Sequence, residues 1–255
     1  MQNPAVMKVK SWKRTIILIA MACAFALASI SCGSGSGDGK SDGATLNAEE
    51  LREFLDRAIE EFDSQESFHF VMDFAGRTTP LDVFPVEMRK VEGDIIVPDQ
   101  LRATIDAKAT DFGGIAVTMQ VIGIGDVAWM TNPFDATQWV DLDTGNPLNG
   151  LFDPSAGVSG VLSGVQNPRV IGEELINEIP TWRIEGTLDS GDLAGFALEV
   201  IPGYEIHGTV WINKETALIH RLHVLGQLNE TEHADILRRL DFSGFHEVEP
   251  IEPPQ

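Results

Sequence analysis

The protein has 255 residues, a length that suits one large domain or two small ones. Its 39 acidic residues outnumber its 18 basic residues and give a formal net charge of −21. Such a surface repels polyanions at long range, which excludes nucleic acid as a partner. Because a chain of this length can bury a sizeable core, its two cysteines are not needed as a disulfide to hold the fold.

The first 31 residues have the form of a secretory signal peptide. Four basic residues, Lys8, Lys10, Lys13 and Arg14, precede an uncharged apolar run over residues 15–30. This run is short for a membrane-spanning helix, which needs about 20 residues. The sequence therefore predicts export of the remaining chain.

The sequence Leu-Ala-Ser-Ile-Ser-Cys, which ends at Cys32, resembles a lipobox, where a signal peptidase cleaves and the cysteine receives diacylglycerol and a palmitate-like acyl chain. Ser29 departs from the pattern, since leucine is commoner there. An ordinary signal peptide with a chance cysteine is the alternative. Against it, Cys23 lies within the apolar run, so cleavage leaves Cys32 as an unpaired thiol in an exported protein. We expect Cys32 to be lipidated and to anchor the chain.

Residues 32–46 are rich in glycine and serine and are predicted to be a flexible tether, with a reach of roughly 20 Å. Cleavage of the signal peptide would remove four basic residues and no acidic ones, which leaves 14 basic against 39 acidic residues. No internal repeat or second linker follows. We therefore expect one domain over residues 47–249 and a short tail over residues 250–255.

The first predicted element of the domain is an amphipathic helix from Ala48 to about Phe62. Asn47 and Glu50 have the spacing of a capping box. Apolar residues then recur at the spacing of one helical face. They are Leu51, Phe54, Leu55, Ala58, Ile59 and Phe62.

From Phe68 onward the apolar period changes to two, which predicts half-buried strands joined by short turns. The clearest alternations begin at Phe68 and at Leu101, and the pattern recurs to the end of the domain. The strands are expected in or near residues 68–74, 101–109, 115–122, 127–130, 139–142, 181–188, 204–213, 217–228 and 236–245. Many strands joined by tight turns indicate a large antiparallel sheet.

Two segments interrupt the strand pattern. Residues 153–165 carry apolar residues at a helix-like spacing, and Gly157, Gly160 and Gly164 indicate a flexible segment beside Leu162. Residues 190–198 could form another short helix.

The order and spacing of several weak motifs resemble the LppX/LprAFG lipoprotein family from about Glu49 to Val248. After the amphipathic helix, these motifs are Ser67–Phe70, Val91–Asp94 with Pro98-Asp99, Asp126–Met130 with Trp139-Val140, Leu151–Pro154 with Leu162, Thr181–Thr187, Val210–Lys214, Leu218–Leu222 and Leu240–Ser243. The resemblance implies an α+β fold: a strongly curved antiparallel sheet, a LolA/LppX-like half-barrel, with helices packed on its concave face.

The resemblance also implies a function. Family members hold the acyl chains of glycolipids or phospholipids between sheet and helices, and carry or present them in the cell envelope. It implies no catalytic residue and no cofactor. We expect an apolar lining, low in polar groups, because acyl chains bind through apolar area removed from water. The expected lining residues are Phe68, Phe70, Met72, Phe74, Leu101, Ala103, Ile105, Ala107, Ile115, Val117, Met119, Val121, Val158, Leu162, Trp182 and Ile184.

The same pattern admits a plainer interpretation, because an alternating apolar face is usually an ordinary packed core. A structural or sensory envelope lipoprotein with no lipid ligand is therefore the main alternative. A hydrolase comes third, since Ser159 and Ser163 lie in an apolar segment without a companion base. The histidines are scattered, and an acidic turn from Asp141 lacks the later glutamate of a calcium loop, so no metal site is predicted.

The expected partners are a membrane lipid or glycolipid and, through Cys32, the membrane itself. A membrane lipid exporter is a further candidate partner, although the sequence identifies none. The expected location is the outer face of the cytoplasmic membrane or elsewhere in the cell envelope.

Overall fold

The computed structural model describes residues 46–76, 79–81, 86–142, 158–194 and 200–254. The predicted signal peptide, Cys32 and nearly all of the predicted tether lie outside these residues, as do Gly157 and most of the acidic turn after Asp141. The account below concerns the domain that begins at Ala44.

The first element is the helix α1, from Ala48 to Asp63. The Asn47 side chain accepts hydrogen bonds from the backbone N–H groups of Glu49 and Glu50, and the Glu50 carboxylate accepts one from the Asn47 N–H. This capping box satisfies donors that a helix start otherwise leaves unpaired. The predicted helix and its cap are confirmed, and the predicted apolar face is buried at Leu51, Phe54, Leu55, Ala58 and Phe62.

Twelve strands follow, together with the short helix α2 (Val158–Gly164) and the 3₁₀ turns η1 (Thr110–Phe112) and η2 (Ser190–Leu193). The strands are β1 (Ser67–Ala75), β2 (Thr79–Leu81), β3 (Val86–Ile96), β4 (Gln100–Ala109), β5 (Ile115–Ile124), β6 (Val127–Asn132), β7 (Asp135–Asp141), β8 (Gln166–Ile176), β9 (Ile179–Asp189), β10 (Glu205–Asn213), β11 (Ile219–Leu225) and β12 (Leu237–Ser243).

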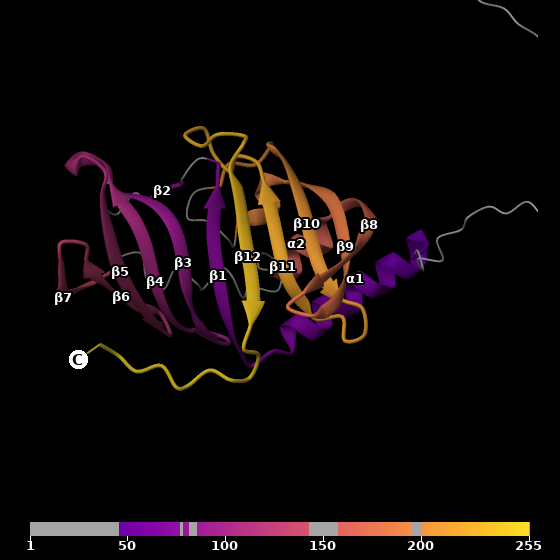
Figure 1. The fold of residues 1–255 in the computed structure, drawn as a ribbon, viewed down its shortest axis with the longest axis horizontal. Helices are drawn as coiled ribbons and strands as arrows, with labels where there is room; N and C mark the ends of the chain where they lie inside the picture. The colour runs from indigo at the N-terminus through magenta and orange to yellow at the C-terminus, as the bar shows by residue number, and fades with distance from the viewer. Residues whose placement is uncertain (1–45, 77–78, 82–85, 143–157, 195–199, 255) are drawn as a thin grey trace, which may run out of the picture. The chain divides into compact units, whose positions relative to one another are not determined.

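All these strands belong to one antiparallel sheet, in the order β7-β6-β5-β4-β3-β1-β12-β11-β10-β9-β8, with β2 added beside β3. Most neighbours are consecutive in the chain, as short hairpins require. Two pairs are exceptions: β1 pairs with β3, past the short β2, and β1 pairs with β12, which places Phe70 opposite Phe242 and joins the two halves of the sheet. The sheet does not close, since β7 and β8 lie at its two ends (Figure 1).

We call the face that carries Phe68 and Phe70 the inner face and the opposite one the outer face. Helices α1 and α2 pack against each other and against the β8 and β9 end of the sheet. In Figure 1, α2 lies behind β10 and β11. A single apolar core joins the inner face to both helices. The fold prediction is thus confirmed.

An aromatic cluster fixes the C-terminal end of α1 to the middle of the sheet. The Phe62 ring lies 5.3 Å from the rings of Phe68 and Phe242, and Phe68 and Phe242 are 5.7 Å apart, all measured between centroids. Phe245 extends the cluster at 6.2 Å from Phe68. Such tilted and edge-to-face pairs add stability beyond their buried area.

Several details differ from the sequence expectation or refine it. The strand ranges expected from alternation did not include β2, β3 or β8. Within the described part of residues 190–198, the helical segment is only the 3₁₀ turn η2. Ile251, in the predicted tail, is only 6% exposed, so the chain remains packed on the domain after the last strand.

Candidate functional site

The predicted lining residues of β1, β4 and β5 share the inner face, as the strand register shows. Phe70 is opposite Gly93, Gly93 is opposite Ala103, and Ala103 is opposite Val121. Residues that are directly opposite in a sheet point to the same side. All predicted positions on these strands are buried except three: Met72 and Phe74 are half-buried, and Ile115 is treated below. The buried ones are Phe68, Phe70, Leu101, Ala103, Ile105, Ala107, Val117, Met119 and Val121.

Ile115 differs from this set because its side chain is 58% exposed. It lies opposite Ala109 at the first position of β5. We therefore leave Ile115 out of the enclosed apolar surface. The other predicted residues of β1, β4 and β5 lie together on the inner face. Their role as a lipid lining stays a prediction.

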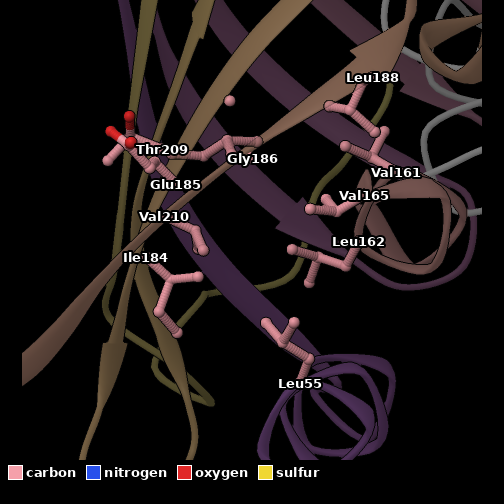
Figure 2. A pocket seen from close by; sticks show the side chains of 12 residues that line it. Leu55, Val161, Leu162, Val165, Ile184, Glu185, Gly186, Leu188, Thr209 and Val210 are labelled. Carbon is pink, nitrogen blue, oxygen red and sulfur yellow. The ribbon is translucent and has the colours of Figure 1, made fainter. Parts of the chain in front are cut away.

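The remaining predicted residues lie at the β8–β11 end of the sheet. Val158 and Leu162 are buried on α2, and Trp182 and Ile184 are buried on β9. A pocket opens among these elements, with Leu55 of α1 below, α2 on one side and the inner face of β9, β10 and β11 on the other (Figure 2). Its remaining lining residues are Val161, Leu162, Val165, Ile184, Gly186, Leu188, Gly208, Val210 and Leu222.

The pocket is apolar and small. Glu185 and Thr209 border it, but their side chains lie on the far side of the strands from α2 (Figure 2). Its cavity volume is about 20 Å³, which is room for one methyl group or one water molecule. A site for a whole lipid tail needs several hundred Å³. In this conformation the pocket could hold only the end of a chain.

Two glycines form the floor of the pocket. Gly186 of β9 and Gly208 of β10 are directly opposite each other in the sheet, at inner-face positions that otherwise carry large apolar side chains. A Cβ added to Gly186 would overlap a methyl group of Val165 and stand 2.9 Å from the carbonyl oxygen of Gln166. A Cβ added to Gly208 would meet a Leu188 methyl at 3.4 Å and the carbonyl oxygen of Gly186 at 3.9 Å. The absence of a side chain at Gly186 therefore lets Val165 and the start of β8 pack closely on the sheet.

Polar contacts tie α2 to α1. The Ser159 hydroxyl donates a hydrogen bond to the Asp63 carboxylate at the end of α1. The Arg52 guanidinium donates to the carbonyl oxygen of Val165, just after α2, at 3.3 Å. The Ser163 hydroxyl donates to the carbonyl oxygen of Ser159. Both serines of the hydrolase alternative thus make packing contacts of α2.

The Lys214 side chain covers the inner face near the start of β9. The Lys214 ammonium group lies 4.1 Å from the centroid of the Trp182 ring and 2.7 Å from a carboxylate oxygen of Glu173. Trp182 is 6% exposed. The ion pair and the cation–π contact together close the end of the apolar interior beneath the β8–β9 and β10–β11 turns.

The outer face carries a network of charges. Asp94 accepts hydrogen bonds from His69 and Arg102, and Asp73 pairs with Arg239. Partial burial by itself raises the pKa of Asp94, but the bonds from Arg102 and His69 outweigh it and hold that pKa below its ordinary value. These pairs give the outer face a polar, internally compensated surface.

The predicted lining left out the two floor glycines and six apolar residues of the pocket: Leu55, Val161, Val165, Leu188, Val210 and Leu222. Leu55 was on the predicted helix face, but periodicity alone did not show which strands it meets. The glycines left a usable signal, since each occupies an apolar-phase position of an alternating strand, between Ile184 and Leu188 or between Ile206 and Val210.

Within the described residues, no three His, Cys, Asp or Glu side chains are grouped so as to hold a metal ion. In the same part of the chain, no helix combines the length and the apolar character needed to cross a membrane. His220 and His223 make separate contacts, with the rings of Phe245 and Trp211 respectively.

Comparisons with known proteins agree on one fold. A structure of LprF from Mycobacterium bovis is similar to this chain with a TM-score of 0.62 and 17% identity, over 81% of this chain and 98% of that one. LppX from Mycobacterium tuberculosis is similar with a TM-score of 0.56 and 19% identity, over 81% of this chain and all of that one. A comparison with curated proteins finds no match.

The family model for the LppX_LprAFG lipoproteins matches residues 50–244, which include all strands of the sheet, α2 and nearly all of α1. The match covers the larger part of the chain, as the resemblance in the sequence predicted. This protein therefore belongs to the LppX_LprAFG lipoprotein family.

Proposed function

We propose that this protein is a noncatalytic, membrane-anchored lipoprotein that binds the acyl chains of a phospholipid or glycolipid and carries or presents the lipid in the cell envelope. The observation that carries the proposal is the apolar pocket between α1, α2 and the inner face of β9–β11, in a domain of this lipoprotein family. Among the residues that the structure describes, no polar side chain faces into this pocket, so it suits hydrocarbon and would leave a headgroup without partners.

The small volume of the pocket sets a condition on this proposal. A chain of many methylene groups requires more than about 20 Å³, so a wall of the pocket has to move when lipid binds. The free energy gained by binding an acyl chain is large, because each methylene group removed from water contributes about 0.8 kcal/mol. A chain of ordinary length can thereby offset the cost of separating a few packed side chains.

The anchor is a separate part of the proposal. We place it at Cys32, with the tether over residues 32–46 allowing the domain to stand off the membrane, at the outer face of the cytoplasmic membrane or elsewhere in the envelope. A membrane lipid exporter would be the natural donor of the bound lipid. Metabolic labelling of the full chain with an alkyne fatty acid should mark the protein, and Cys32→Ser should abolish the label. Labelling that survives this substitution would place the anchor elsewhere.

Binding is tested by titrating the full chain, with Cys23→Ala and Cys32→Ser to remove both thiols, with cis-parinaric acid, a fluorescent fatty acid. We expect saturable binding at one class of site and displacement by palmitate and by phospholipid. A signal that rises linearly without saturation, and that palmitate does not displace, would contradict the proposal.

A second candidate is a structural or sensory envelope lipoprotein without a lipid ligand. The observation in its favour is the close packing at the pocket, where α2 lies against a floor of glycine and leaves little empty volume. The same titration separates the two functions, because this candidate requires that saturable binding be absent.

A further inference from the structure

One wall of the pocket is held much less firmly than the others. The floor belongs to β9 and β10, which pair continuously from Glu205–Asp189 to Asn213–Thr181 within the large sheet. Helix α1 is 16 residues long and is fixed by the packing of Phe62 on Phe68 and Phe242. Helix α2 is described over Val158–Gly164 and packs on α1, η2 and β9 through side chains, outside the hydrogen-bond ladder of the sheet. Local opening favours elements that the hydrogen bonds of the sheet do not hold.

Helix α2 packs on α1, η2 and β9, and two polar contacts fix it to α1. At its start, Ser159 donates to Asp63 of α1, and just after its end Arg52 of α1 donates to the carbonyl oxygen of Val165. Between these points, Val161, Leu162 and Val165 face the pocket. The Val165 side chain rests where a side chain of residue 186 would otherwise lie. Only van der Waals contact joins α2 to this part of the floor.

The floor itself is a trough across two strands. Gly186 and Gly208 lie side by side, with Ile184 and Val210 on one flank and Leu188 and Ile206 on the other. With α2 in place, Val165 lies over Gly186, and Gly208 borders the small pocket. With α2 raised, a strip of bare backbone bordered by apolar side chains would be exposed, and an unbranched hydrocarbon chain fits such a strip better than a branched or polar group.

We propose that α2 is the wall that moves, and that the bound acyl chain lies in the trough over Gly186 and Gly208 once α2 has lifted. This inference rests on the proposed lipid-binding function and adds the place of the chain and the contact that controls access to it. The Ser159–Asp63 hydrogen bond favours the closed state and so lowers the fraction of molecules that can accept a chain. Weakening it raises that fraction and the observed association rate in proportion.

Two variants test the two halves of the inference, in the thiol-free full chain with cis-parinaric acid as the probe. Ser159→Ala removes the bond to Asp63, and we expect association to become about fivefold faster, the factor that one hydrogen bond supplies. Ser64→Ala is its control, because the Ser64 hydroxyl, just after α1, donates to the carbonyl oxygen of Glu61 and accepts from the Gln65 amide, both local to the end of α1. The control should leave the rate unchanged.

Gly208→Ala places a methyl group in the trough at a position where the closed protein has space for it. We expect the variant to fold, as circular dichroism will show, and to bind the probe at least about tenfold more weakly, the effect of one misplaced methyl group in a tight apolar site. Thr209→Val, at the next residue on the outer face, is the control and should bind as the parent chain does.

The outcomes separate this inference from the function on which it rests. If the parent chain binds the probe, and Ser159→Ala and Gly208→Ala both match it in rate and affinity, the moving wall and the trough are wrong while lipid binding stands. If the parent chain shows no saturable binding, both proposals fall. Should Gly208→Ala not fold, hydrogen exchange decides: amides of residues 161–165 should exchange faster in Ser159→Ala than in Ser64→Ala, and equal rates would contradict the inference.

Discussion

The side chains of Arg238 and Glu232 form an ion pair at the top of the inner face, with only 9% and 2% of their surfaces exposed. Arg238 also donates to the carbonyl oxygen of Gly226 at 3.0 Å, and Glu232 accepts from the backbone N–H of Leu228 at 2.8 Å. The pair therefore ties the connection between β11 and β12 to the sheet and satisfies two backbone groups there. Its charges are compensated within the fold, as buried charges must be.

Removal of one partner should be costly because the other charge would stay buried without compensation. We expect Glu232→Gln to lower the free energy of unfolding by about 3 kcal/mol. The control is Asp241→Asn, which breaks the more exposed pair with Arg221 and should cost less than about 1 kcal/mol. Urea unfolding followed by circular dichroism measures both. Equal losses in the two variants would show that burial does not set the strength of the Arg238 pair.

His223 should make the stability of the fold depend on pH. Burial and then the charges of Arg221 and Arg239 lower its pKa from the ordinary 6.5, and its ring lies 4.5 Å from the ring of Trp211. The unfolded chain therefore takes up a proton at a higher pH than the folded chain does. The resulting stability is present above about pH 6.5 and is lost as the pH falls toward the lowered pKa of the folded protein.

The measurement compares the unfolding free energy between about pH 7.5 and pH 5.5, the range in which histidine titrates. We expect His223→Gln to reduce the loss of stability across this range. His220, whose pKa burial also lowers, contributes in the same direction, so the double variant with His220→Gln should show a still smaller loss. An unchanged pH dependence in the double variant would refute this assignment.

The Ala-rich strand β4 offers a test of the inner face away from the pocket. Ala103 and Ala107 are 4% and 2% exposed, and their small size limits how far β4 fills the interior. We expect Ala103→Phe or Ala107→Trp to reduce lipid uptake severalfold, at a cost of about 1–3 kcal/mol in stability from overpacking. The control Thr104→Phe places the same bulk on the outer face. If these variants take up as much lipid as the parent protein, the bound acyl chain does not contact this face.

Helix α1 is the wall of the pocket that we expect to stay fixed, and its N-terminal cap at Asn47 gives a prediction for the stability of the fold. Asn47→Ala removes the acceptor for the N–H groups of Glu49 and Glu50 and should destabilise the fold by about 1 kcal/mol. Asn47→Asp keeps an acceptor and should be close to neutral. Thermal unfolding monitored at equal protein concentration distinguishes the two, and indistinguishable midpoints would mean that the cap does not stabilise α1.

The sequence predicted those parts of the fold that depend on local patterns. The capping box at Asn47 and the apolar spacing after it predicted α1, because these signals act within a few residues. Alternation from Phe68 predicted β1 and its inner face for the same reason. The pairing of β1 with β12 left no local signal, since Phe70 and Phe242 meet only when the whole chain has folded.

The candidate site was harder to predict because it depends on which elements come together. Alternation assigned Ile115 to the apolar lining but could not show that its side chain is exposed at the start of β5. Nor could it show that Gly186 and Gly208 share one register position and carry α2 above them. Lys214 follows a strand as an ordinary turn residue, and only the pairing of β9 with β10 brings it over Trp182.

The central claim is that the interior opens to hold hydrocarbon, and native mass spectrometry of the full chain, purified from membranes without detergent, tests it most directly. We predict a species heavier than the chain by the mass of a lipid, at up to one lipid per chain, beyond any lipid attached at Cys32. Solvent extraction should release this lipid, and denaturation should remove it. A single lipid-free mass, unchanged after incubation with phospholipid vesicles, would contradict the account.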